Sequence, residues 1–120
     1  MAKNLDIIVL FDIYGEMLTQ KQQDFISYYY NDDLSLAEIA ENEGITRQGV
    51  RDAIKRAEAQ LLAFEENLGL HERLEKTRKG LEEIAELTKL IDEVNRRTIL
   101  SREINDATAR ISTLTQIISE

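Results

Sequence analysis

The chain contains no proline over 120 residues, and only five glycines interrupt it. Proline and glycine are the residues that most often break helices and shape tight turns, so their scarcity predicts long helices. Hydrophobic residues make up 42% of the chain, which is enough for a packed core, and charged residues make up 32%. These values predict an all-α fold in which each helix keeps a solvated face.

Cap signals divide the first part of the chain into helices. The first helix is expected from Leu5 to Tyr14, with Gly15 as its C-cap. Thr19 and Gln22 form a capping box that opens a second helix. The apolar surface of the first helix is expected to comprise Leu5, Ile8, Val9, Phe11 and Ile13, and that of the second Phe25, Ile26 and Tyr29.

The next two helices have the pattern of a helix-turn-helix unit. Ser35 and Glu38 form another capping box, and Gly44 ends the short helix that they open. Thr46 caps a longer helix, which is expected to run to about Asn67 before Gly69. A short helix, a glycine turn and a second helix that can enter a major groove define this unit. The buried residues of the two helices are expected to be Leu36, Ile39, Ala40, Val50, Ile54 and Ala57.

The second helix of this unit is basic in an acidic chain. Residues 47–56 contain four cations and one anion, Asp52, whereas the formal net charge of the chain is −8. An acidic protein with its positive charge on one helix is expected to present that helix to the phosphates of DNA or RNA. Gln48 can pair with an adenine edge, and Arg47 or Arg51 with guanine. The candidate nucleic-acid-binding residues are Thr46, Arg47, Gln48, Arg51, Lys55 and Arg56. The alternative is an ordinary solvated helix face.

The chain beyond Gly69 has a different apolar pattern. A fifth helix, with a possible kink at Gly80, is marked by Leu74, Leu81, Ile84, Leu87, Ile91 and Val94. Residues 95–98 predict a bend. The last segment has heptad spacing at Leu100, Ile104, Ala107, Ile111, Leu114 and Ile118. A helical hairpin and a coiled-coil seam between two copies both explain the pattern, and we favour a homodimer. We expect a helix-turn-helix domain at residues 1–69 and a helical extension at 70–120.

Cysteine and histidine, two residue types that often act in catalysis and metal binding, are absent or scarce. The chain has no cysteine and one histidine, His71, so a thiolate or a zinc cluster is not expected. No glycine-rich phosphate loop or Ser/His/Asp arrangement is recognisable. We therefore expect no enzyme, no cofactor and no metal. No stretch has the length of a membrane span or the form of a signal peptide, which predicts a cytoplasmic protein.

Four stretches resemble the YlxM family of small bacterial proteins: LFDIYG at 10–15, LTQKQ at 18–22, YYYNDDLSLAEIAE at 28–41 and RQGVRDAIKR at 47–56. The N-terminal part of that family is similar to the promoter-reading C-terminal region of sigma factors. The resemblance therefore implies a sigma-region-4-like helix-turn-helix bundle. Family genes tend to lie beside those for the signal recognition particle GTPase or its receptor, which implies an accessory role there. The chain departs from the family at Gly49, usually alanine, and at Arg51, often aromatic.

Two function hypotheses follow. The first is a nucleic-acid-binding regulatory or accessory protein that acts through residues 46–56. The alternative is a protein-interaction module with a degenerate helix-turn-helix, whose partners are proteins of the targeting machinery. Phosphate contacts make affinity fall steeply with salt, whereas a protein interface gives a shallower dependence.

Overall fold

The computed structural model describes residues 1–98 and 100–119, and its regular elements there are all helical. It confirms the predicted all-α fold, a helix-turn-helix bundle followed by long C-terminal helices. The elements are α1 (Asp6–Tyr14), the 3-10 turn η1 (Gly15–Met17), α2 (Gln20–Ile26), the π-helical segment η2 (Ser27–Asn31), α3 (Leu36–Glu43), α4 (Arg47–Leu68), α5 (Leu70–Arg97) and α6 (Arg102–Ser119). The chain divides into two compact units, Met1–His71 and Glu72–Glu120.

The predicted caps are present in the first unit. Thr19 and Ser35 each accept a backbone hydrogen bond, from Gln22 at 3.2 Å and from Glu38 at 3.1 Å. In both capping boxes the third residue of the helix returns a side-chain bond to the cap backbone. Each helix start is therefore encoded locally, by residues three positions apart.

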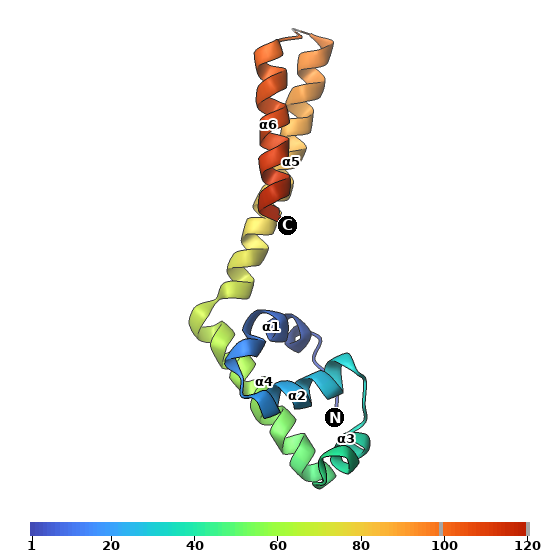
Figure 1. The fold of residues 1–120 in the computed structure, drawn as a ribbon. Coiled ribbons are helices and arrows are strands. Elements are labelled where there is room, and N and C mark those ends of the chain that lie inside the picture. Colours follow the sequence, from blue (N-terminus) through green and yellow to red (C-terminus); the bar gives the residue numbers. More distant parts are fainter. Residues whose placement is uncertain (99, 120) are drawn as a thin grey trace. The chain divides into compact units, whose positions relative to one another are not determined.

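The core of the first unit forms around α4, against which α1, α2 and α3 all pack (Figure 1). Val50, Ile54 and Ala57 have no exposed surface, which confirms the predicted inner side of α4. The other core residues are Ile7, Leu10, Tyr14, Leu18, Phe25, Ile26, Tyr29, Tyr30, Ile39, Ala40 and Leu61. Because a fully buried face holds α4 in place, its opposite face is free to be polar.

The first helix agrees only in part with the prediction: Ile8, Phe11 and Ile13 pack half-buried against the core. Its buried residues are Ile7, Leu10 and Tyr14, whereas Leu5 is 72% exposed. Gly15 is the C-cap of α1, as predicted, but it has a right-handed φ of −54°, and the chain continues into a 3-10 turn. Gly15 is therefore no left-handed cap. It is buried, and a Cβ there would lie 3.0 Å from the ring of Phe11, so the position requires a small residue.

The second unit is a helical hairpin in which α5 and α6 run side by side (Figure 1). Helix α5 passes through Gly80 and ends at Arg97, within the predicted bend at 95–98. The side-chain amide of Asn95 donates to the carbonyl of Ser101 at 2.9 Å, and its oxygen accepts from the Ser101 amide at 2.8 Å. Two reciprocal bonds thus close the turn between the helices.

Across the described part of the chain, no helix combines the length and the apolar character that a bilayer span needs.

Candidate nucleic-acid interface

The interface is built on the turn between α3 and α4. Gly44 adopts a left-handed φ of 69°, and the Ile45 amide donates to the Ala40 carbonyl at 3.1 Å, which ends α3. The Thr46 hydroxyl then accepts from the Gly49 amide at 3.0 Å and caps α4. A glycine is needed at this turn because other residues rarely adopt positive φ. The two caps hold the start of α4 at a defined place beside α3.

Three of the predicted residues form a row of solvated cations. Arg47, Arg51 and Lys55 follow one another at intervals of four on α4 and are all exposed. Within the described residues, none of the three forms a salt bridge. No carboxylate of the described residues neutralises their charge in a salt bridge. The three side chains are therefore available to bind a phosphate that approaches α4.

The other three predicted residues have internal partners. The Gln48 side chain donates to Asp52 Oδ1 at 2.9 Å, and Arg56 Nε to the carbonyl of Asp52 at 3.5 Å. The Thr46 hydroxyl is engaged as the helix cap. To read a base, the Gln48 side-chain amide must break its hydrogen bond to Asp52 and form hydrogen bonds to the base edge instead. Thr46 shapes the site through the backbone of α4.

A hollow beside the cation row extends the site onto α3. The residues that line it are Ser35, Leu36, Ala37, Thr46, Arg47, Gln48 and Arg51. It thus brings the N-terminal turns of α3 and α4 to one place. Backbone amides at a helix N-terminus favour negative charge, so both helix starts add to the attraction exerted by the arginines.

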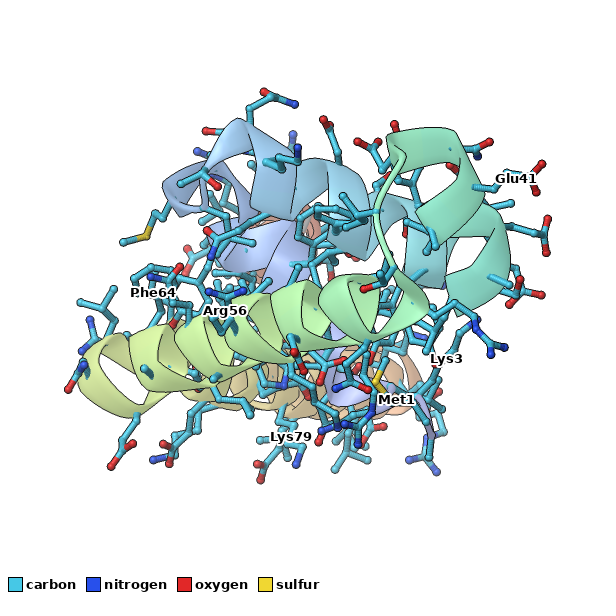
Figure 2. All side chains as sticks on the ribbon, turned by 90° about the horizontal axis from the view of Figure 1, so that it is seen from below. Met1, Lys3, Glu41, Arg56, Phe64 and Lys79 are labelled. Atoms are coloured by element: carbon cyan, nitrogen blue, oxygen red, sulfur yellow. The ribbon has the colours of Figure 1, made fainter. Side chains whose placement is uncertain are left out.

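Lys21 is a cation that the sequence prediction missed. It lies in the first turn of α2 and lines a second hollow together with Arg56, Phe25, Ile45 and the backbone of Gly49. Figure 2 shows Arg56 on the side of α4 that faces α2. The two cations are far apart in sequence, and only the packing of α2 on α4 brings them to one rim. No local pattern could have indicated this proximity.

Negative charge near the site is concentrated on α3. Glu38 is engaged in the capping box, where its side chain accepts from the Ser35 amide at 3.3 Å. Glu41 is exposed and projects from the outer side of α3 in Figure 2. Tyr28 lies near Glu43, whose charge is the main reason that the pKa of the Tyr28 phenol is raised. These carboxylates repel phosphate and therefore oppose the attraction exerted by the cation row.

Gly49 lies in the first turn of α4. A Cβ at this position would come within 3.2 Å of Thr46 Oγ1, the atom that caps the helix. An alanine here would improve helix propensity but would press on the cap, because the two atoms would be closer than they usually are.

The described residues contain no cluster of side chains that could hold a metal ion. Within 1–98 and 100–119, no three side chains of the metal-binding kinds gather in one place. His71 lies at the start of α5, where its backbone amide donates to Glu65 Oε1 at 3.0 Å.

Comparison of the sequence with known proteins identifies a family and several relatives. The family described as "Putative helix-turn-helix protein, YlxM / p13 like" (UPF0122) matches residues 1–98. A UPF0122 protein of Desulforamulus reducens is 49% identical over 81 residues, 68% of this chain and 69% of that protein. A relative from Shouchella clausii is 49% identical over 91 residues, with 76% and 81% covered. One from Bacillus cereus is 50% identical over 93 residues, with 78% and 82% covered. These matches confirm the resemblance to the YlxM family.

Proposed function

The chain belongs to the YlxM / p13-like family of helix-turn-helix proteins, and from this premise we propose that it binds nucleic acid as a regulatory or accessory protein. The observation that carries the proposal is the row of exposed cations Arg47, Arg51 and Lys55 at the start of α4, which has no salt-bridge partner among the described residues. In this proposal residues 1–69 form the binding domain, and residues 70–120 form an extension for assembly.

The roles within the site follow from the contacts of each residue. Arg47, Arg51 and Lys55 bind phosphates, and Arg56 with Lys21 extends the contact toward α2. Gln48 reads a base edge after leaving Asp52, and Thr46 holds the helix start. Because most of these contacts go to phosphate, affinity depends strongly on salt, and DNA and RNA are both possible ligands.

Assembly and location complete the proposal. With a net charge of −8, one recognition helix gives few favourable contacts, and a homodimer doubles them. The family resemblance suggests components of the signal recognition particle as partners, in the cytoplasm. The competing function is a protein-interaction module, which the solvated carboxylates of α3 favour because they weaken binding to phosphate.

The test removes two cations of the row. Arg47→Ala with Arg51→Ala is expected to lower affinity for a mixed-sequence DNA duplex or a structured RNA at least tenfold, measured by fluorescence anisotropy. The matched control is Lys79→Ala with Lys89→Ala, which removes the same charge from exposed positions of α5. The control is expected to bind within about twofold of the wild type. Unchanged binding by the first variant, with its helicity intact by circular dichroism, would favour the protein-interaction module.

A further inference from the structure

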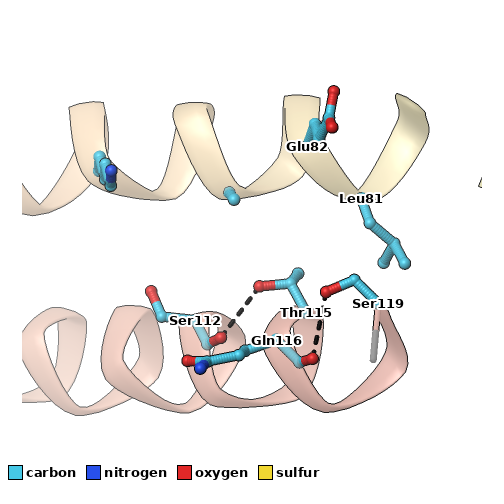
Figure 3. A pocket seen from close by; sticks show the side chains of 8 residues that line it. Leu81, Glu82, Ser112, Thr115, Gln116 and Ser119 are labelled. Carbon is cyan, nitrogen blue, oxygen red and sulfur yellow. Dashed lines mark hydrogen bonds between the residues drawn. The ribbon is translucent and has the colours of Figure 1, made fainter. Parts of the chain in front are cut away.

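The most deeply buried side chains between α5 and α6 are polar. The buried residues of the hairpin are Thr88, Asn95, Thr108 and Thr115, which we name the polar seam. The threonine hydroxyls bond to carbonyls of their own helices, for example Thr88 to Ile84 at 2.7 Å. Figure 3 shows one end of the seam, with Leu81 and Glu82 on α5 and Ser112, Thr115 and Ser119 on α6. The fully buried positions of the hairpin are therefore polar, and of its large apolar residues Leu81 and Ile104 are half-buried.

The other large apolar residues of the two helices remain on the surface. The seven large ones on this face are between 37% and 59% exposed. Together with Ala107, which is also exposed, they form what we name the apolar face, Ile84, Leu87, Ile91 and Val94 of α5 and Ala107, Ile111, Leu114 and Ile118 of α6. The heptad stripe expected from the sequence is thus not buried within the chain.

Helical geometry places both rows on one side of the hairpin. At about 100° per residue, the row on α5 is rotated by about 100° from its own part of the polar seam, and the row on α6 by the same angle in the same sense. The two helices run in opposite directions, so equal rotations about their own axes point to the same side. The rows therefore form one continuous surface that is two helices wide.

This surface has the composition and size of an interface. Its eight members carry no charge, in a chain with 32% charged residues. Side chains about half exposed make it roughly 700 Å² per copy, close to the roughly 800 Å² per partner of a standard interface. Apolar patches of this size are rare on proteins that remain monomeric.

We propose that the apolar face of one hairpin docks on the same face of a second copy, so that two α5–α6 hairpins form a four-helix bundle. The spacing of three and four residues in each row is that of core positions in such bundles. A second copy covers both rows, whereas a single added helix would fill the groove between them and leave the outer edges exposed. The inference deepens the homodimer of the proposed function, on which it rests.

The test uses the full chain and substitutions that leave its charge unchanged. Leu87→Gln with Leu114→Gln changes two exposed members of the apolar face. Leu90→Gln with Ile117→Gln is the matched control, because these residues are 54% and 58% exposed on the same helices but outside the face. By sedimentation equilibrium at tens of micromolar, the wild type and the control are expected to be dimers. The first variant is expected to raise the dimer Kd at least tenfold without loss of helicity.

Either of two results would overturn the interface. One is a wild type that sediments as a monomer, which would mean that the face is open or serves another protein. The other is equal dissociation of both variants. Binding to a DNA duplex tests the proposed function separately from the interface. The variant Arg47→Ala with Arg51→Ala is expected to remain a dimer while losing affinity for the duplex. A monomeric wild type that still binds the duplex would remove the interface and leave the nucleic-acid function standing.

Discussion

Two tyrosines join the N-terminal part of the chain to carboxylates of α4. The Tyr30 hydroxyl donates to Glu58 Oε1 at 2.7 Å, and the Tyr14 hydroxyl to Glu65 Oε1 at 2.6 Å. Glu58 is itself buried, so its carboxylate depends on this donor. Burial, followed by the bond to Glu58, raises the pKa of Tyr30 to about 12. The aromatic run at 28–30 is thus largely core: Tyr29 and Tyr30 are buried, and Tyr28 is half-buried.

The Tyr30 bond predicts loss of stability at alkaline pH. Above pH 10 the unfolded state loses the phenol proton, while the folded state keeps it until about pH 12. The unfolding free energy should therefore fall through this window, by about 1.4 kcal/mol per pH unit for one proton. Urea unfolding at pH 9, 10 and 11 measures the slope. Tyr30→Phe should be less stable at every pH but show a shallower slope. Parallel slopes would mean that Tyr30 does not titrate in this range.

At the scale of the helices, the sequence predicts well the helix starts and ends that depend on local residues. The capping boxes at Thr19 and Ser35 and the left-handed glycines at 44 and 69 operate within a few residues, and the structure contains all of them. The face of α1 was predicted only in part, because the helix is apolar on nearly all sides: Ile8, Phe11 and Ile13 pack against the core, but Leu5 is exposed. The periodicity of α1 is then weak, and packing on α4 selects Ile7 and Leu10.

The same limit applies to the candidate site and the hairpin. The exposure of Arg47, Arg51 and Lys55 could be predicted because the opposite side of α4 is mostly apolar. The bond between Gln48 and Asp52 and the approach of Lys21 depend on rotamers and tertiary packing. In the hairpin, a heptad stripe indicates an interface but does not identify which helix covers it.

Packing between α3 and α4 makes a stability prediction. Ile39 and Val50 have no exposed surface. Changing either one to alanine should lower the free energy of unfolding by about 1 to 4 kcal/mol, because a cavity replaces buried methyl groups. The control is Leu62→Ala, at a position of α4 that is 46% exposed, where the loss should be smaller. Chemical denaturation of the three variants gives the comparison. Equal losses at all three positions would show that the helix faces are assigned wrongly.

At the scale of the whole molecule, two kinds of contact respond in opposite ways to salt. The phosphate contacts proposed for the cations of α4 should weaken as salt rises, because the release of counterions from the nucleic acid is less favourable in concentrated salt. An uncharged apolar interface is not weakened, and in a chain of net charge −8 salt also screens the repulsion between two copies. Salt can therefore separate nucleic-acid binding from assembly in a single protein.

The last prediction uses this difference. If each copy contributes about three phosphate contacts, the affinity of the dimer for a DNA duplex should fall with a log–log salt slope of about −5. The variant Leu87→Gln with Leu114→Gln, binding as a monomer, should have a slope of about −3 and a lower affinity, since only one recognition helix contacts the duplex. Anisotropy titrations between 50 and 300 mM salt, paired with sedimentation at the same salt concentrations, give both quantities. A wild type whose slope matches that of the monomeric variant would show that the second α4 does not reach the nucleic acid, even where the dimer persists.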